Sequence, residues 1–157
     1  FQLSAIFIKH WELWVMKRMS LETQIPQICT DCRMEDFYLK EETYQIIGLC
    51  MEVHKILGKG HSENVYGDAL EYEFKMNNIP YEREKKYNIE YKGIVLPRYY
   101  FSDFTVFNEI ILELKAIETL SNSELKQTLN YLAASKNKIG LLINFGEVSL
   151  KYKRVIL

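Results

Sequence analysis

The sequence predicts an α/β (α+β) fold whose elements follow the order α-α-β-β-β-α-β-β. Three observations carry this prediction. Two stretches in which apolar residues recur at helical spacing come first. Three strand-like stretches separated by turn signals follow, and a capped helix then leads into two further strands. With 157 residues, the chain is long enough for one domain with a substantial buried core.

Two helices are expected before the first strand. Apolar residues recur at helical spacing from Glu41 to Leu57, and residues 58–60, Gly-Lys-Gly, end this helix. His61 or Ser62 then begins a second helix, which ends at residues 77–80, Asn-Asn-Ile-Pro.

The second half of the chain combines strands with one more helix. Lys92-Gly93 and Asn108 separate the first three strand-like stretches. Residues 121–123, Ser-Asn-Ser, are cap candidates for a helix that runs to about Ser135. The five expected strands cover residues 87–93, 98–107, 109–116, 139–145 and 148–157.

Composition limits the classes of function. Hydrophobic residues make up 48% and charged residues 26%, as in ordinary globular proteins. A net charge of −1 gives no general attraction to nucleic acid or membrane, so contact with nucleic acid must depend on local basic clusters or a bound cation. No segment reaches the roughly 18 apolar residues that a membrane-spanning helix needs. Three cysteines predict no disulfide framework, which favours a reducing compartment, the cytoplasm.

Residues 1–33 are expected to be an extension that need not be native to the domain, and residues 34–157 to form the domain. Met34 is a plausible start, and the apolar part of the extension is too interrupted by charge for a membrane span. Cys29 and Cys32 form one C-x-x-C pair. A zinc site needs about four ligands, so this pair alone does not predict one.

Glu113 and Lys115 stand two residues apart in an apolar run, directly after Ile110-Ile111-Leu112 in the expected strand "EIILELKA". Side chains alternate along a strand, so these two share one face while Leu112 and Leu114 share the other. Burying such charges costs several kcal/mol each unless they are paired or bound to metal. A buried ion pair is therefore one explanation and a metal site is another.

Asp103 interrupts the preceding apolar strand, "YYFSDFTVF". If residues 107–109 form a three-residue hairpin loop, the numbers of paired residues add to 216, and Asp103 pairs with Glu113 on one face. A two-residue loop would send Asp103 to the opposite face. Asn108 tolerates the left-handed geometry that a three-residue loop uses. Converging carboxylates with a lysine beside them predict a Mg²⁺ or Mn²⁺ site.

Asp103 and Glu113-x-Lys115, on strands that follow a helix, resemble the PD-(D/E)XK nuclease superfamily. Residues 60–66, "GHSENVY", have the form Gly-x-x-Glu-x-x-Tyr and look like the signature of the GxxExxY proteins within that superfamily. The segments "VHKILGKG", "ELKA" and "GLLINF" are similar to that family as well, so the resemblance spans roughly residues 41–157. It implies a restriction-endonuclease-like core with a central mixed sheet flanked by helices.

The same resemblance implies roles for individual residues. Asp103 and Glu113 would bind the metal, together with the carbonyl group of Leu114, and Lys115 would orient the attacking water or stabilise charge on the phosphate. Glu63 matches an acidic residue that many of these nucleases add to the metal site from a helix. The alternative for Glu63 is a helix-start carboxylate favoured by the helix dipole.

Gln127 and Tyr131 lie four residues apart, on one face of the expected helix. They look like the Gln-x-x-x-Tyr motif of the exonuclease branch, where the motif supports the catalytic site. The alternative is an ordinary helix surface with a half-buried tyrosine. One departure from the family is that residues 118–127, "ETLSNSELKQ", lack the His or Pro often found there.

Together with this resemblance, the residues predict a divalent-metal-dependent nuclease that hydrolyses phosphodiester bonds, with DNA rather than RNA as the expected substrate and Mg²⁺ or Mn²⁺ as the cofactor. Its expected partner is nucleic acid rather than a membrane, and an oligomer is compatible with the sequence. The alternatives are a non-catalytic nucleic-acid or protein-binding module that keeps the nuclease fold, and a structural oligomer with buried ion pairs. Candidate phosphate contacts, or else solvated strand edges, are Arg83, Lys85, Lys86, Arg98, Lys151, Lys153 and Arg154.

Overall fold

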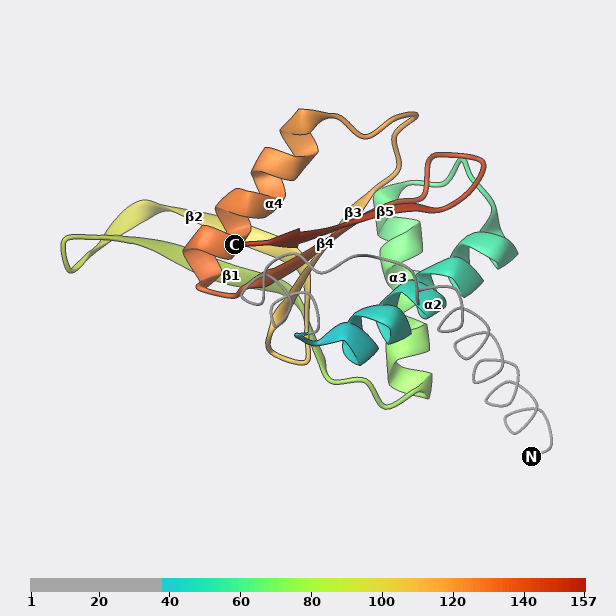
Figure 1. The fold of residues 1–157 in the computed structure, drawn as a ribbon, viewed down its shortest axis with the longest axis horizontal. Helices are drawn as coiled ribbons and strands as arrows, with labels where there is room; N and C mark the ends of the chain where they lie inside the picture. The colour runs from blue at the N-terminus through green and yellow to red at the C-terminus, as the bar shows by residue number, and fades with distance from the viewer. Residues whose placement is uncertain (1–37) are drawn as a thin grey trace, which may run out of the picture. The chain divides into compact units, whose positions relative to one another are not determined.

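The computed structural model describes residues 38–157, which form three helices and one five-stranded sheet (Figure 1). The element order is the predicted one. The helices are α2 (Lys40–Leu57), α3 (Glu63–Met76) and α4 (Asn122–Ser135). The strands are β1 (Tyr81–Tyr91), β2 (Ile94–Val106), β3 (Ile110–Lys115), β4 (Ile139–Asn144) and β5 (Lys151–Ile156). Cys29 and Cys32, like the whole expected extension of residues 1–33, lie outside the described residues.

The sheet is mixed, and its strands follow one another in sequence order from β1 to β5. Strands β3 and β4 are parallel, while the other neighbouring pairs are antiparallel. The parallel pair requires a crossover, which α4 supplies. This arrangement confirms the expected mixed sheet flanked by helices.

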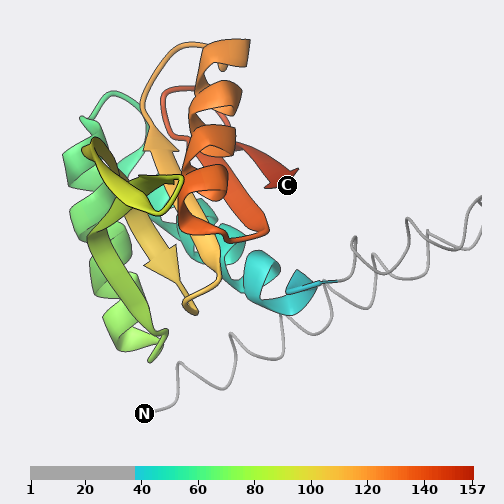
Figure 2. The same ribbon diagram turned by 90° about the vertical axis from the view of Figure 1, so that its left-hand side faces the viewer.

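The helices cover both faces of the sheet, with α2 and α3 on one side and α4 on the other (Figure 2). Apolar residues of α2 and α3 pack on one face of β3, which presents Ile110, Leu112 and Leu114 to them. On the opposite face, α4 packs against Ile111. No helix within residues 38–157 is both long and apolar enough to cross a membrane.

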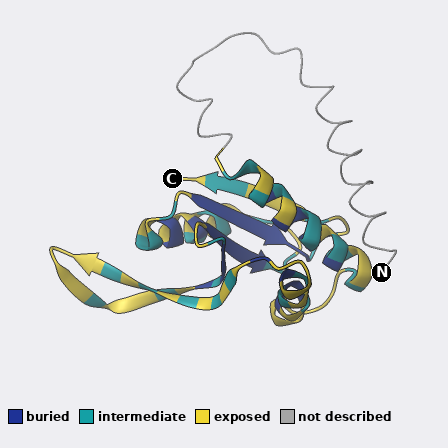
Figure 3. Cartoon of the chain, turned by 90° about the horizontal axis from the view of Figure 1, so that it is seen from below, coloured by how far each residue is buried: buried dark blue, intermediate teal, exposed yellow. Residues whose placement is uncertain are grey.

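Burial divides the sheet into two parts. Strands β3 and β4 are buried almost throughout, whereas the hairpin of β1 and β2 becomes exposed towards its turn at Lys92-Gly93 (Figure 3). Strand β1 begins at Tyr81, earlier than the expected residue 87. The early part is strongly charged, and it gains its shelter from α3, which lies beside Tyr81 and Arg83.

The loop of residues 107–109 connects β2 to β3 as predicted. Phe107 and Asn108 both have left-handed φ angles, 54° and 61°. The paired residues are Phe104 with Leu112, Thr105 with Ile111 and Val106 with Ile110, whose numbers add to 216. The predicted register is confirmed for these three pairs. The pairing ends with Phe104 and Leu112, so Asp103 and Glu113 lie just beyond it and do not form the predicted direct pair.

Candidate active site

Strands β2 and β3 separate just beyond the Phe104–Leu112 pair, and the candidate site lies at this point. Beyond that pair, the Leu114 N–H donates a hydrogen bond to Oδ2 of Asp103 at 2.7 Å. This hydrogen bond holds the side chain of Asp103 beside β3, at the point where the two strands part.

Glu113 is buried, with 2% of its surface exposed. Its Oε1 atom has no hydrogen-bond partner among the described residues. Burial, reinforced by the carboxylate of Asp103, raises the pKa of Glu113 to about 9, although the charge of Lys115 opposes the increase. The side chain is therefore protonated near neutral pH, even with the charge of Lys115 close by.

Asp103 is half-buried and has a related electrostatic environment. Burial raises the pKa of Asp103, while the Leu114 N–H and the charge of Lys115 oppose the increase. The carboxylate of Glu63 also raises this pKa. Three acidic side chains from two strands and a helix therefore lie within electrostatic reach of one another.

Lys115 is the cation nearest to Glu113, and their side chains come from the same face of β3. The Lys115 Nζ atom lies 3.8 Å from Oε2 of Glu113, and 15% of the lysine side chain is exposed. A direct charged hydrogen bond is usually about 2.7–2.9 Å long. The two groups therefore attract each other without forming the close contact typical of a committed buried ion pair.

Asn144 stands beside Lys115 in the parallel pairing of β3 with β4, and it is fully buried. Its Oδ1 accepts hydrogen bonds from the N–H groups of Ile117 and Gly146, and its Nδ2 donates to the Ile117 carbonyl at 2.8 Å. A Cβ at Gly146 would lie 2.2 Å from that carbonyl, so only glycine fits. Asn144 thus fixes the chain immediately after Lys115. Sequence reasoning missed this role, although a polar residue ending the run "IGLLIN" was the available signal.

Glu63 is the first residue of α3 and reaches across to the end of β3. Its Oε1 accepts a hydrogen bond from the Ala116 N–H at 3.2 Å. The side chain is exposed, yet its charge contributes to the raised pKa values of both Asp103 and Glu113. The structure therefore gives Glu63 a contact with the site in addition to its position at a helix start.

Gln127 and Tyr131 contact each other on the face of α4 that covers β3. The Gln127 Nε2 donates to the Tyr131 hydroxyl at 2.7 Å, and the tyrosine ring packs edge-on against Tyr100. Burial raises the pKa of Tyr131, the contact with Gln127 opposes this, and the carboxylates of Glu113 and Asp103 raise it further. Tyr131 therefore lies within electrostatic reach of the two carboxylates, and a supporting role for Gln127 and Tyr131 stays a prediction.

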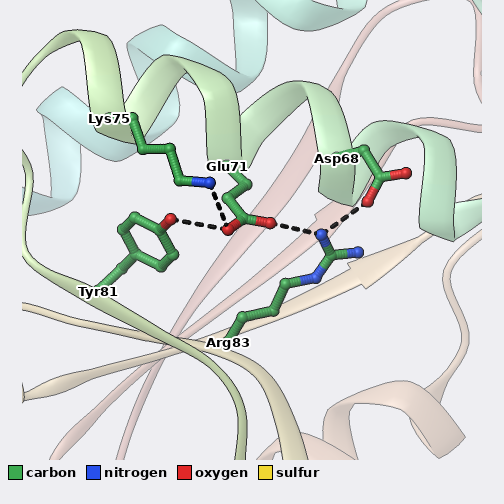
Figure 4. Close-up of polar contacts among 5 residues, drawn as sticks. All are labelled: Asp68, Glu71, Lys75, Tyr81 and Arg83. Carbon is green, nitrogen blue, oxygen red and sulfur yellow. Dashed lines mark hydrogen bonds and ion pairs between the residues drawn. The ribbon is translucent and has the colours of Figure 1, made fainter.

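Arg83 of β1 belongs to an ionic cluster with α3, shown in Figure 4. Its Nη1 lies 2.6 Å from both Asp68 Oδ1 and Glu71 Oε2, and Glu71 also accepts from Tyr81. Hydrogen bonds from Lys75, Arg83 and Tyr81 lower the pKa of Glu71 to about 2. The sequence offered Arg83 as a phosphate contact or a solvated strand-edge residue, whereas two carboxylates of α3 engage it in the structure. The cluster instead fastens α3, and with it Glu63, to the sheet.

A small hollow of about 50 Å³ opens beside Asp103. It lies between α3 and the sheet, and Gly67 provides room there because a Cβ would lie 3.3 Å from Nη2 of Arg83. The lining residues are Glu63, Asn64, Gly67, Arg83, Glu84, Asp103, Phe104 and Leu114. Asn64 and Glu84 were not anticipated from the sequence.

The carboxylates of Asp103 and Glu113 repel each other when both are charged, and a divalent cation held by both would remove that repulsion. Glu113 offers a buried oxygen that no other described residue hydrogen-bonds, and Asp103, whose Oδ2 accepts from the Leu114 N–H, lies beside it. Within residues 38–157, no three His, Cys, Asp or Glu side chains form a ready-made metal cage. Two carboxylates therefore have to be supplemented by backbone carbonyl groups or water, which Mg²⁺ accepts readily.

Three comparisons with known proteins bear on the family of this chain. A solved structure described as "Crystal structure of SSO0001" is 18% identical, with a TM-score of 0.48, and the match covers 96% of this chain and 78% of that one. The comparison with curated proteins found no match. The family model of the PD-(D/E)XK nuclease superfamily matches residues 40–155. This match covers most of the chain, from the start of α2 into β5, and includes Asp103 and Glu113; the protein therefore belongs to the PD-(D/E)XK nuclease superfamily.

Proposed function

We propose that this protein is a divalent-metal-dependent nuclease that hydrolyses phosphodiester bonds in DNA in preference to RNA. Membership of the superfamily supports a nuclease with a nucleic-acid substrate. The preference for DNA rests on the resemblance seen in the sequence. The cytoplasm is the proposed compartment, on the basis of cysteine usage.

One observation carries the proposal. Glu113 is buried beside Asp103 with an oxygen that has no partner among the described residues, while Lys115 stays 3.8 Å away. If the only role of Glu113 were to pair with Lys115, a close contact that satisfies the buried oxygen would be expected. A cation between the two carboxylates would satisfy that oxygen and favour the charged form of Glu113.

The proposed metal ligands are Asp103, Glu113 and the Leu114 carbonyl, with Glu63 acting on the helix side. A bound Mg²⁺ or Mn²⁺ would polarise the phosphate and lower the pKa of a bound water. Lys115 would hold the attacking water or stabilise negative charge on the phosphate. Gln127 and Tyr131 would support the Glu113 side from α4, and Asn144 would keep Lys115 in place.

We also propose that the chain is one of the GxxExxY proteins, because each residue of the motif has a local role here. Gly60 has a φ of 110°, which favours glycine. Glu63 contacts the Ala116 N–H at the end of β3. Tyr66 is fully buried, stacks on Phe145 and donates its hydroxyl hydrogen to the Gly58 carbonyl at 2.7 Å. The motif thus sets the entry into α3 and the position of Glu63.

Incubation with end-labelled single-stranded and double-stranded DNA and RNA, in Mg²⁺, Mn²⁺ or EDTA, tests the proposal. We expect cleavage of DNA with either metal and none in EDTA. Asp103→Asn should abolish cleavage, whereas Glu118→Gln, which changes an exposed carboxylate on the loop after β3, should not. Binding of nucleic acid without cleavage under every metal condition would favour the non-catalytic module instead.

A further inference from the structure

The outer part of the β1–β2 hairpin, residues 85–101, is called the distal ribbon here; α4 covers one side of its base, and its tip projects beyond that helix (Figures 1 and 3). On the covered side, Tyr87 and Tyr100 pack against the cluster under α4. On the uncovered side, Tyr99 and Phe101 are each 49% exposed, and their rings meet edge-on with centroids 5.3 Å apart. Large aromatic side chains exposed together usually indicate a binding surface.

The distal ribbon is also basic. It contains four basic residues and one acidic residue, a net charge of +3 within a chain whose net charge is −1. The Nζ atom of Lys86 lies over the Tyr99 ring, 4.1 Å from its centroid. Among the described residues, neither Lys86 nor Arg98 forms an ion pair. Their positive charges are therefore available to an anionic partner.

The uncovered rings lie next to the candidate active site. Phe101 precedes Asp103 by two residues along β2, a distance of about 7 Å at the usual strand rise. The β1–β2 pairing is interrupted opposite Asp103, where Glu84 has a left-handed φ of 51°. Glu84 and Asp103 also line the same hollow. A chain leaving the catalytic carboxylates along β2 therefore reaches Phe101 first and Tyr99 next.

We propose that the uncovered side of the distal ribbon binds an unpaired strand of the nucleic-acid substrate, next to the phosphate that is cut. Bases would stack on Phe101 and Tyr99, while Lys86, which pairs with Phe101 on the same side, contacts a phosphate. An unpaired strand fits better than a duplex, because a duplex keeps its base faces stacked inside. This inference rests on the proposed nuclease function and adds the form of the substrate.

A second copy of this chain fits the distal ribbon less well. Two ribbons with a charge of +3 each would repel one another, and lysines on an edge strand discourage strand-to-strand association. A polyanion has the opposite charge and supplies flat rings for the exposed aromatic side chains. Charge complementarity thus selects nucleic acid as the occupant.

Fluorescence anisotropy with a labelled 20-nucleotide single strand, in EDTA to prevent cleavage, measures this binding directly. Phe101→Ser should raise Kd by about 5-fold to 150-fold, the usual effect of losing one base–aromatic stack. Tyr72→Ser is the matched control, because Tyr72 is an exposed tyrosine on α3, and it should leave Kd unchanged. The parent protein should bind the single strand more tightly than a duplex of the same sequence.

The salt dependence of binding tests the proposed phosphate contacts. Lys86→Gln should reduce the slope of log Kd against log salt by about 0.7 for a single strand. Lys55→Gln, an exposed lysine on α2, should leave the slope as it is in the parent. An unchanged slope in Lys86→Gln would remove this lysine from the binding surface.

Two further measurements separate failure of this inference from failure of the nuclease proposal. Bis(4-nitrophenyl) phosphate, a diester too small to reach the distal ribbon, should be hydrolysed with Mn²⁺ by Phe101→Ser as fast as by the parent. Hydrolysis by the parent combined with unchanged strand binding by Phe101→Ser would overturn the ribbon inference alone.

A changed elution volume in size-exclusion chromatography, or a large fall in Tm, for Phe101→Ser would also overturn the ribbon inference, because a second copy or another part of the chain would then cover the ring. Binding that depends on Phe101, without hydrolysis of any diester by the parent, would instead overturn the nuclease proposal.

Discussion

Glu113 is kept at 2% exposure without a hydrogen-bond partner for Oε1 among the described residues, at a cost to the stability of the fold. Its pKa of about 9 means that the metal-free protein keeps the carboxyl group neutral over most of the physiological range. Ionisation of this one group therefore links metal binding, pH and stability.

The first prediction follows from the sign of this pKa shift. The pKa of Glu113 is raised above its ordinary value of 4.5, so its contribution to stability is complete below pH 4.5 and is lost as pH rises towards 9. Without metal, the free energy of unfolding of the parent should fall across this range. The free energy of unfolding of Glu113→Gln should fall less over the same range, and this variant should be more stable than the parent at pH 8. Denaturant unfolding in EDTA between pH 4.5 and 9 measures both, and parallel curves for the two proteins would contradict the assignment.

The register of β2 and β3 up to the Phe104–Leu112 pair could be predicted from the sequence, because a three-residue loop leaves one even pairing. The parting of the strands beyond that pair, where Asp103 accepts from the Leu114 N–H, could not. Metal binding by these residues stays a prediction. The roles of Asn144 and Arg83 could not be predicted, because both depend on partners distant in sequence. Asn144 contacts the loop after β3, and Arg83 contacts two carboxylates of α3.

At the scale of elements, helix α4 approaches the sheet closely at Gly140 of β4. A Cβ at this position would lie 2.6 Å from Cγ2 of Thr128 and 3.3 Å from Cδ1 of Leu132. Glycine therefore sets the distance between α4 and the strands, and with it the position of Gln127 and Tyr131 relative to Glu113.

Gly140→Ala should force α4 outwards, lower stability by about 1–3 kcal/mol and reduce cleavage. The double variant Gly140→Ala/Thr128→Ser removes the methyl group that the new Cβ meets and keeps the hydroxyl that donates to the Glu124 carbonyl. It should recover most of both losses, as judged by denaturant unfolding and by cleavage of labelled DNA. No recovery would show that α4 is not held at this distance by the Thr128 contact.

Element order was predictable because helical and strand periodicities are local properties of the sequence. The start of β1 at Tyr81 was not, since the segment that follows is charged and is sheltered by α3 rather than by its own apolar pattern. The irregularity at Glu84 has no local signal either. Glu84 has a left-handed φ angle although it is not a glycine, and this irregularity is evident only in the structure, where β1 pairs with β2.

At the scale of the whole molecule, the family match begins at residue 40, close to the start of α2. We propose that residues 34–157 form the folding unit. A chain that starts at Met34 should unfold cooperatively, with nearly the Tm of the full chain and the same increase in Tm on adding Mg²⁺. Loss of the cooperative transition would show that residues 1–33 belong to the fold.

The central claim is that Asp103 and Glu113 bind a metal ion, and that Glu113 is not simply the ion-pair partner of Lys115. Thermal melting of Lys115→Met with and without Mg²⁺ tests this claim most directly. We predict that Mg²⁺ raises the Tm of both the parent and Lys115→Met, because the carboxylates remain in both. Without metal the variant should be about as stable as the parent, since Glu113 is protonated and the apolar side chain needs no solvation. If Lys115 is instead the ion-pair partner of Glu113, the substitution should cost about 3–5 kcal/mol. Strong destabilisation of the variant that Mg²⁺ does not relieve, together with no effect of Mg²⁺ on the parent, would contradict the metal site.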